Sequence, residues 1–423
     1  MTTSECRAAI ESGALDERFA ALYPSVPQAR ERYLTCLARH EERYGPQEEI
    51  FFFSTPGRTE IGGNHTDHQN GTVLAGAVSL DLVAAVSRNS SHTVRIESEG
   101  YPADSLDLAD LSPKDDEKNH SSSLIRGVLA KIREKGYLVS GFDAYTMSDV
   151  LRGSGLSSSA AFEVSIAGIA NSLFCGDTLS PVELAQIAQY AENIYFGKPS
   201  GLMDQTACAV GGCVKIDFQD PEKPLLETVS FDLSKDGYQL VIVNCGGNHA
   251  DLTDDYAAIP AEMKEVAGSF GKNRLRDVAP ADFFQELPSL RKKCGDRAVL
   301  RAVHFFHENE RASLLTEAIR QGDLSRFFQL VQASGRSSYE LLQNIYSEKH
   351  PREQDLAVAL CLTERLLHGE GACRVHGGGF AGTIQAYVPQ ALLPELVASL
   401  EAVFGKGCCQ ILNIRQEGSI RIL

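Results

Sequence analysis

The stretch Leu151-Arg-Gly-Ser-Gly-Leu-Ser-Ser-Ser-Ala-Ala161 is the part of this sequence that says most about the fold. It joins glycines and three consecutive serines to the first residues of an apolar segment. Glycines let a backbone approach a ligand closely, and the free N–H groups at a helix N-terminus favour phosphate. A serine oxygen can also bind magnesium. The stretch therefore predicts a phosphate-binding loop, although a Ser/Gly linker before a helix would have the same composition.

Two helices are predicted after this loop. The first begins near Ser158, because apolar residues then recur at helical spacing: Phe162, Ile166, Ile169, Ala170, Leu173 and Phe174. The second runs from Ser180 to about Phe196, where Ser180-Pro-Val-Glu183 has the residues of a capping box and Gly197 supplies the stop. Its apolar face would consist of Leu184, Ile187, Ala188, Ala191, Ile194 and Tyr195.

The rest of the chain mixes strand-like and helix-like segments. Strands are predicted at residues 49–54, 80–87, 93–97, 239–244 and 383–388, and further helices at 312–321 and 325–343. This mixture predicts an α+β fold. A chain of 423 residues exceeds one typical domain, so two lobes are expected, which we place at residues 1–225 and 226–423.

The composition excludes several classes of protein. The chain is 43% hydrophobic and 23% charged, as in folded soluble proteins, and its formal charge of -16 argues against nucleic acid as a partner. No apolar run reaches the roughly 18 residues of a membrane span, and the N-terminal residues lack a targeting pattern, so a cytoplasmic protein is expected. The eleven cysteines form no CxxC pair, which argues against a disulfide framework or a structural metal site.

A second informative segment, from Pro56 to Gly71, is dense in groups that can bind a sugar. It reads Pro56-Gly-Arg-Thr-Glu-Ile-Gly-Gly-Asn-His-Thr-Asp-His-Gln-Asn-Gly71. An uncharged sugar needs several donors and acceptors in fixed geometry, and Asn, His and Asp supply both kinds. For any one of His65, Asp67 or His68 alone, a polar turn before the next strand is the favoured interpretation. The two histidines lack the spacing of HExxH and have no Cys partner, so they do not predict a metal cluster.

Taken together, these segments resemble the galactokinase branch of the GHMP small-molecule kinase family. The segment from Pro56 to Gly71 is similar to the signature GRVNLIGEHTDY, and residues 151–161 are similar to the phosphate loop PxGxGLSSSAA. Residues 371–383, GACRVHGGGFAGT, are similar to the C-terminal motif GARMTGAGFGGC. Residues 201–205 match GxMDQ, and residues 301–311 resemble the helix HVVxExxR. The resemblance covers nearly the whole chain.

The resemblance implies a two-lobed GHMP fold with mixed β-sheets flanked by helices and an active site between the lobes. ATP and Mg²⁺ would bind there, and phosphate would pass to the anomeric hydroxyl of a sugar. By position, Asp204 corresponds to the catalytic aspartate that accepts the hydroxyl proton, and Arg58 to its arginine partner. Ser159, or its neighbour Ser158, and Glu192 match the magnesium ligands.

The same matching implies further ligand contacts. The residues at sugar-binding positions are Asn64, His65, Asp67, Gly201 and Tyr256. The residues at ATP-binding positions are Gly153, Ser154, Gly155, Leu156, Ser157, Ser158 and Ser159. Tyr256 matches only loosely, and a solvated helix residue is the alternative there. Gly378 and Gly379 would let the C-terminal loop pack against the site, or would simply form a hairpin turn.

Three departures from the family's motifs bear on the substrate. Asn64 stands where the motif has Glu, a residue that contacts the C6 hydroxyl, and a neutral Asn would no longer repel a C6 carboxylate. Leu151 and Arg152 replace Pro and a small residue. Residues 254–268 lack the family's paired arginines, and residues 344–355 lack its DYxVS pattern.

The function predicted is an ATP-dependent galactokinase that forms galactose 1-phosphate and acts as a monomer on small molecules alone. A kinase for galacturonate or N-acetylgalactosamine is the nearest alternative, which Asn64 keeps open. A sugar- and ATP-binding sensor without catalysis is the alternative from another class. Arg58, Asp204 and Glu192 argue against the sensor.

Overall fold

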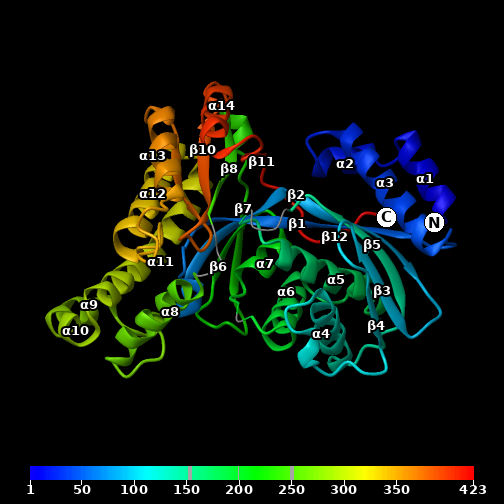
Figure 1. Cartoon of the computed structure of the whole chain (residues 1–423), viewed down its shortest axis with the longest axis horizontal. Helices are drawn as coiled ribbons and strands as arrows, with labels where there is room; N and C mark the ends of the chain where they lie inside the picture. Colours follow the sequence, from blue (N-terminus) through cyan, green and yellow to red (C-terminus); the bar gives the residue numbers. More distant parts are fainter. Residues whose placement is uncertain (151–154, 199, 248–251) are drawn as a thin grey trace.

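The computed structural model describes residues 1–150, 155–198, 200–247 and 252–423. Within these ranges the chain forms two β-sheets with helices packed on them (Figure 1). The first sheet contains β1 (Phe51–Gly62), β2 (Thr72–Arg88), β3 (Thr93–Ser98), β4 (Asp104–Asp107), β5 (Phe142–Ser148), β6 (Cys213–Asp217), β7 (Leu225–Val229) and β12 (Ile420–Arg421). The second contains β8 (Tyr238–Gly246), β9 (Ala372–His376), β10 (Gly382–Pro389) and β11 (Cys409–Leu412). The predicted α+β fold is confirmed.

The order of the strands shows how the first sheet is assembled. Its main path is β12-β1-β2-β5-β3-β4, and β6 pairs with the beginning of β2 and then with β7. β3 and β5 run parallel, whereas β1 and β2 are antiparallel. The register of β1 against β2 shifts between Pro56 and Arg58. A shift of this kind re-aims a side chain, and Arg58 is the residue that it places.

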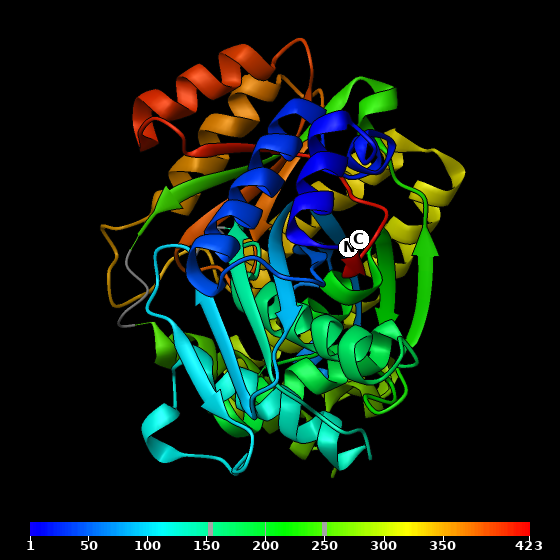
Figure 2. The ribbon, with the colours of Figure 1, turned by 90° about the vertical axis from the view of Figure 1, so that its right-hand side faces the viewer.

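Helices cover both faces of the first sheet (Figures 1 and 2). One face carries α1 (Thr3–Ser12), α2 (Asp16–Leu22) and α3 (Val26–Tyr44), and the other carries α4 (Ser121–Glu134), α5 (Ser158–Phe174), α6 (Pro181–Tyr190) and α7 (Met203–Val210). Three successive phenylalanines of β1 pack alternately against the helices on the two faces of the sheet. Phe51 and Phe53 belong to the core beneath α4–α7, and Phe52 belongs to the core beneath α1–α3. This alternation is expected, because neighbouring side chains of a strand point to opposite faces.

Of the remaining helices, the last three in the chain pack on the second sheet, whereas the others form a group whose longest member contacts β2 of the first sheet (Figure 1). These remaining helices are α8 (Thr253–Gly268), α9 (Pro280–Gln285), α10 (Leu287–Cys294), α11 (Asp296–Gln321), α12 (Leu324–Ser337), α13 (Asp355–Leu367) and α14 (Leu393–Phe404). The two helices predicted in this region are confirmed. Residues 312–321 form the second half of α11, and residues 325–343 largely coincide with α12 and the π-helical turn η6 (Ser338–Leu342). No helix in the described ranges has both the length and the apolar composition that crossing a membrane requires.

The helix predicted from Ser180 begins as expected but ends differently. The Ser180 hydroxyl accepts a hydrogen bond from the Glu183 N–H, and the Glu183 carboxylate accepts one from the Ser180 N–H. After Tyr190 the chain enters a π-helical turn, η3 (Ala191–Phe196), which Gly197 ends with a φ of 88°. The π turn shifts the faces of the helix, and Ile194 is 52% exposed. The prediction that Ile194 lies on the buried face was therefore wrong.

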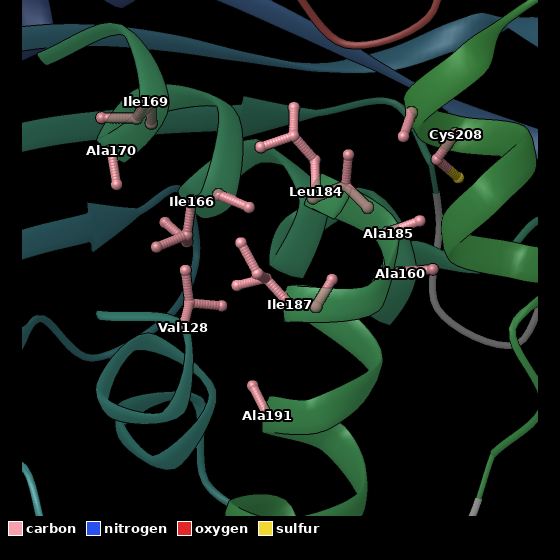
Figure 3. Close-up of a cluster of buried hydrophobic side chains, with 14 of the residues drawn as sticks. Val128, Ala160, Ile166, Ile169, Ala170, Leu184, Ala185, Ile187, Ala191 and Cys208 are labelled. Atoms are coloured by element: carbon pink, nitrogen blue, oxygen red, sulfur yellow. The ribbon is translucent and has the colours of Figure 1, made fainter. Parts of the chain in front are cut away.

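Small and branched side chains hold the layer of α4–α7 together (Figure 3). Val128 of α4, Ile166 of α5 and Ile187 of α6 are fully or almost fully buried in it, together with Ala191 of η3. Gly127 of α4 brings two segments especially close, because a Cβ atom there would lie 2.8 Å from the Ala191 Cα. This packing fixes the N-terminus of α5 and the η3 turn against the same core.

Candidate active site

An arginine–aspartate pair stands at the centre of the site. Arg58 comes from β1 and Asp204 from the first turn of α7, 146 positions later in the chain. The Arg58 Nε donates to Asp204 Oδ1 at 2.7 Å, and Arg58 Nη2 donates to Asp204 Oδ2 at 2.7 Å. Arg58 Nη1 also donates to the carbonyl of Gly155. A bidentate pair of this kind fixes the carboxylate in position and orientation.

The surroundings of Asp204 keep it ionised. Burial opposes the charge, but the Arg58 guanidinium and the hydrogen bonds from Arg58 and Ser157 hold the pKa of Asp204 below its ordinary value. The Ser157 hydroxyl donates to Asp204 Oδ2. The Asp204 side chain is still 32% exposed, so an incoming hydroxyl can reach it. The group is thus a carboxylate at neutral pH with room for a proton donor.

The predicted phosphate loop leads into the N-terminus of α5. Ser157 stands at the N-cap with a φ of 58°, and Leu156, whose carbonyl accepts from the Arg58 N–H at 3.1 Å, connects the loop to β1. Gly155 has a φ of 73°, and a Cβ atom there would lie 2.5 Å from Thr383 Oγ1. A residue with a side chain at position 155 would clash with Thr383 and would be strained in this left-handed conformation, so glycine is favoured there. Gly153 and Ser154, with the departure at Leu151 and Arg152, lie outside the described residues.

A second polar cluster lies beside the N-terminus of α5. Glu192 of η3 is 2% exposed, and its two oxygens accept from Lys198 Nζ at 2.8 Å and from Gln205 Nε2 at 2.9 Å. The same Gln205 amide donates to Glu163 Oε2 at 3.3 Å. Burial raises the pKa of Glu163 well above its ordinary value, and the charge of Glu192 adds to this effect. The cluster thus places two carboxyl groups next to the serines of α5.

Two cavities meet at these serines. The smaller one, of about 370 Å³, contains both members of the Arg58–Asp204 pair, and the larger one has about 580 Å³. Ser158 and Ser159 line both, so α5 begins where the two cavities join. The smaller cavity is lined further by Gly155, Ser157, Lys198, Tyr256, His376, Gly377, Gly378, Gly379, Ala381, Gly382 and Thr383. The larger one includes Leu82, Tyr101, Leu124, Thr146, Phe162, Glu163, Glu192 and Phe196.

Of the residues at the predicted sugar positions, Tyr256 lines the smaller cavity, and His65 and Asn64 bond to carbonyls of glycines that line it. His65 has a φ of 59°, and its Nε2 lies 3.0 Å from the carbonyl of Gly378. Burial and the neighbouring His68 lower the pKa of His65 to about 4, so the ring is neutral and its Nε2 donates to that carbonyl. Asp67 contacts Gly201 closely, since a Cβ atom on Gly201 would lie 2.0 Å from Asp67 Oδ2.

Tyr256 belongs to the wall of the smaller cavity. Its hydroxyl donates to the carbonyl of Gly379 at 2.7 Å, and its ring stands edge-on to Phe380 with the ring centroids 5.3 Å apart. A Cβ atom on Gly378 would lie 2.6 Å from the Tyr256 ring. Tyr256 is therefore packed against the glycine-rich loop, and the alternative of a solvated helix residue does not describe it.

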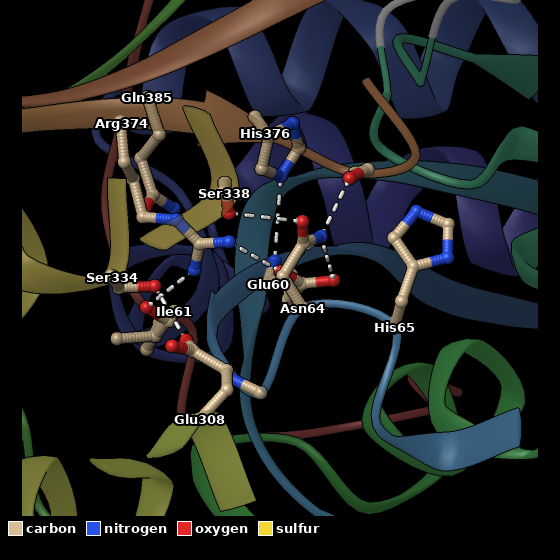
Figure 4. A network of polar contacts seen from close by, with 12 residues as sticks. Glu60, Ile61, Asn64, His65, Glu308, Ser334, Ser338, Arg374, His376 and Gln385 are labelled. Carbon is tan, nitrogen blue, oxygen red and sulfur yellow. Dashed lines mark hydrogen bonds and ion pairs between the residues drawn. The ribbon is translucent and has the colours of Figure 1, made fainter. Parts of the chain in front are cut away.

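Asn64 lies behind this wall, in a buried polar network (Figure 4). Its amide nitrogen donates to Glu60 Oε1 at 3.0 Å and to the carbonyl of Gly377 at 2.8 Å. Its oxygen accepts from Ser338 Oγ at 3.2 Å and from Asn344 Nδ2 at 3.0 Å. All four hydrogen-bonding positions of the Asn64 amide are thus used by the protein. Gly377 and Gly378 line the smaller cavity, whereas Asn64 is not among the described residues that line it.

Sequence reasoning missed several residues of the site. Glu163 and Gln205 bracket Glu192, Lys198 bonds to it, and His376 lies beside the Arg58–Asp204 pair with its Nε2 3.0 Å from Thr59 Oγ1. A charged Glu163 within an apolar helix was a usable signal. Lys198 gave none, because a lysine in a surface loop is ordinary.

Comparison with known proteins agrees with this geometry. Residues 123–212 match the family described as GHMP kinases N terminal domain, and residues 38–88 match the Galactokinase galactose-binding signature. A galactokinase of Streptomyces coelicolor is 33% identical over 373 residues, which cover 86% of this chain and 91% of that protein. A galactokinase of Actinobacillus pleuropneumoniae serotype 3 is 32% identical, over 85% of this chain and 90% of that protein.

Solved structures share the fold. The crystal structure of Lactococcus lactis galactokinase complexed with galactose has a TM-score of 0.78 at 24% identity, covering 92% of this chain and 99% of that chain. Methanococcus jannaschii mevalonate kinase has a TM-score of 0.61 at 14% identity, covering 87% and 99%. Given the sequence identity to galactokinases over most of both chains and the two matched family descriptions, this chain belongs to the galactokinase family of GHMP kinases.

Proposed function

We propose that the protein transfers the γ-phosphate of ATP to the anomeric hydroxyl of galactose. The bidentate Arg58–Asp204 pair, which lines the smaller cavity together with Ser158 and Ser159, carries this proposal. Asp204 accepts the proton of the C1 hydroxyl while the C1 oxygen bonds to the γ-phosphorus and the bond to the β,γ-bridging oxygen breaks. Arg58 keeps Asp204 ionised and oriented, and its charge stabilises the charge that develops on the phosphoryl oxygens.

The larger cavity suits the nucleotide. Leu82, Leu124 and Phe162 offer apolar surface to a base, and the cavity leads to Ser158 and Ser159 at the N-terminus of α5. The free N–H groups and the dipole of that 17-residue helix favour the phosphates. In this arrangement Gly155, Leu156 and Ser157 form the edge over which the triphosphate passes toward Asp204. The predicted contacts of Gly153 and Ser154 belong to the same proposal.

The residues next to the serines suit Mg²⁺. Glu192 and Ser159, or its neighbour Ser158, would hold the ion, because carboxylate and hydroxyl oxygens are the ligands it prefers. The cavity that these residues line also receives Glu163, whose Oε1 is buried and has no hydrogen-bond partner within the described structure. When bound, the ion would neutralise phosphate charge. The oxygen donors present are of the kind that such an ion binds.

The sugar would occupy the smaller cavity beside Asp204. His65, Asp67, Gly201 and Tyr256 would bind its hydroxyls or shape the space around them. We assign Asn64 a supporting role, because its amide holds Glu60 and the Gly377 carbonyl behind the cavity wall. The neutral side chain then provides no specific reason to prefer a uronic acid, and galactose becomes the first candidate over galacturonate and N-acetylgalactosamine.

We propose the same two lobes as the working division of a monomeric, cytoplasmic enzyme. The first sheet draws its described strands from residues 51–229 and 420–421, and the second from residues 238–412. Residues 1–225 and 226–423 approximate these two bodies.

The variant Asp204→Asn tests the proposed base. Removing the proton acceptor while nearly preserving its shape should lower kcat by a factor on the order of 10² or more and leave the galactose Kd within about threefold. Calorimetry would give the Kd, and ADP release would give kcat. Asp232→Asn, which changes an exposed turn carboxylate, is the matched control. Turnover of Asp204→Asn close to that of the parent protein would contradict the assignment.

A further inference from the structure

Lys198 occupies a position next to the carboxylate that we assign to the metal. Its Nζ lies 2.8 Å from Glu192 Oε1, and Glu192 has no other cation within ion-pair distance among the described residues. The second oxygen of Glu192 is held by the Gln205 amide. The Lys198 ammonium thus occupies the one Glu192 oxygen that the Gln205 amide does not hold, which is the oxygen that a metal ion would bind.

The balance of charge around this lysine is unusual. Three carboxyl groups, Glu163, Glu192 and Asp204, act electrostatically on Lys198. Arg58 is engaged by Asp204 on both sides of its fork, which leaves Lys198 to neutralise Glu192. The Oε1 of Glu163 is buried and lacks a partner within the described structure. Among the described residues, the site therefore has more carboxyl oxygens than Arg58 and Lys198 satisfy.

Lys198 is also free to leave this position. Its side chain is 57% exposed, and it follows Gly197, which has the left-handed φ of 88°. The lysine lines the smaller cavity together with Ser158, Ser159 and Asp204, where the phosphates would lie. A flexible four-carbon stem lets the ammonium exchange one anionic partner for another within this cavity.

We propose that the Lys198 ammonium holds the cation position at Glu192 while no nucleotide is bound, and moves to the terminal phosphates when the metal–nucleotide complex enters. The inference rests on the proposed function, since it takes Glu192 as a metal ligand. It implies that a divalent cation alone competes with Lys198 and binds weakly. A cation that arrives with the nucleotide meets no such competition, because the phosphates supply the displaced ammonium with a new partner.

The test is a titration of the nucleotide-free protein with Mn²⁺, in which the free ion is measured by electron paramagnetic resonance. Lys198→Met removes the charge and keeps an unbranched chain, and it should bind Mn²⁺ at least about tenfold more tightly than the parent protein, because the competing charged hydrogen bond is gone. Lys198→Arg should bind like the parent. Lys135→Met is the matched control, since Lys135 forms an ion pair with Glu183 at the same 2.8 Å outside both cavities.

Two further measurements make the outcome decisive. The gain in Mn²⁺ affinity should vanish in the double variant Lys198→Met, Glu192→Gln, and ADP in the presence of EDTA should bind Lys198→Met several-fold more weakly than the parent. Equal Mn²⁺ affinity in Lys198→Met and the parent, or a gain that survives loss of Glu192, would overturn the proposal. Glu192→Gln alone, titrated with Mn²⁺ and AMP-PNP, tests the proposed metal site separately. Weakened binding there together with no effect of Lys198→Met would leave the function standing and remove only the role of Lys198.

Discussion

At the scale of single residues, Glu163 shows how the site departs from ordinary core packing. It is fully buried in α5, whose other buried residues are mostly alanine, valine and isoleucine. Within the described structure its carboxyl group accepts one hydrogen bond, from the Gln205 amide at 3.3 Å. Burial raises the pKa of Glu163 well above its ordinary value, with the charge of Glu192 as a second cause. Such a residue stays protonated in the folded protein over a pH range in which the unfolded chain has already ionised.

Glu163→Gln should therefore change how stability depends on pH. Between the ordinary pKa of 4.5 and the raised value, the folded parent protein holds one more proton than the unfolded chain, so its stability falls as pH rises, by about 1.4 kcal/mol per unit. Below 4.5 both states are protonated and this slope disappears. Glutamine cannot ionise, so the variant gains relative stability as pH rises above 5.

Urea unfolding in EDTA at a series of pH values from about 4 to 8 measures this difference. A gap between variant and parent that stays constant over the whole range would show that Glu163 is ionised in the folded protein.

At positions 60 and 64, the carboxylate and the amide side chain are exchanged relative to the family signature. Aligned with GRVNLIGEHTDY, this chain has Glu60 where the signature has Asn and Asn64 where it has Glu. In the structure the two side chains share a hydrogen bond of 3.0 Å, and Glu60 is paired with the fully buried Arg374 at 2.6 Å. These two positions together thus keep a single carboxylate.

Asn64→Glu should be strongly destabilising, because it puts a second buried carboxylate against Glu60. A loss of about 3 kcal/mol or more is expected. Glu60→Asn should also destabilise, since Arg374 loses its partner. The double variant restores one carboxylate and one amide, so the two effects should be non-additive by on the order of 1–3 kcal/mol.

A double-mutant cycle by urea unfolding measures this coupling. Strictly additive losses would mean that the two positions act independently.

The residues that could be predicted were those carried by motifs. Arg58, Asp204 and Glu192 became candidates because several neighbouring residues match the family's motifs together, and the structure brings Arg58 and Asp204 into contact. Lys198 lies in an ordinary surface loop, so no pattern marks it, whereas the signal of Glu163 is a single acidic residue within an apolar helix. The sequence shows that Asn64 departs from the family's motif. It does not show the partners of the Asn64 side chain, because Ser338 and Asn344 are 274 and 280 positions away in the chain.

At the scale of elements, the η3 turn places the proposed metal ligand. The capping box and apolar spacing of α6 were predictable, because both are local patterns. The π turn after Tyr190 was not, since helical spacing assumes 3.6 residues per turn throughout. This turn exposes Ile194 and keeps Glu192 buried beside Gln205. Its position is set by α4, where Gly127 allows the backbone of Ala191 to come close.

Gly127→Ala should therefore disturb the site from a distance. The new methyl would meet Ala191 at 2.8 Å and the Tyr195 ring at 2.9 Å, so η3 has to move. We expect a loss of about 1–3 kcal/mol in stability and a raised magnesium requirement for turnover.

Gly268→Ala is the matched control, because it adds a methyl to the end of α8 with nothing within 4 Å. It should leave stability unchanged or slightly raised and leave activity intact. An unchanged magnesium requirement in Gly127→Ala would show that the contact between α4 and η3 does not determine the position of Glu192.

At the scale of the whole molecule, the site depends on contacts between segments that are distant in the sequence. Five of the twelve described strands and the α+β class followed from local patterns. The pairing of β12 with β1 did not, because Ile420 and Arg421 are too short a segment to carry a signal. Two ends of the chain thereby meet at one sheet (Figures 1 and 2), as the Ile50 N–H to Met1 carbonyl bond and the Phe52 N–H to Leu423 carbonyl contact show.

The same long-range assembly joins the two cavities. The smaller one takes residues from β1, the N-terminus of α5, α7, α8 and the loop before β10, and the larger one takes residues from β2, α4, α5 and η3. A charge of -16 on the whole chain makes local cations necessary for an anionic substrate, and Arg58 and Lys198 supply them at the junction.

The central claim is that this junction phosphorylates the anomeric hydroxyl of galactose. Its most direct test is ADP release by the purified protein with ATP and Mg²⁺, across galactose, galacturonate, N-acetylgalactosamine, glucose and arabinose, with ³¹P NMR of the product and Asp204→Asn as control. We predict that galactose is preferred, that the product carries an anomeric phosphate, and that turnover depends on Asp204. Sugar binding without turnover of any sugar, or turnover that survives in Asp204→Asn, would contradict the account.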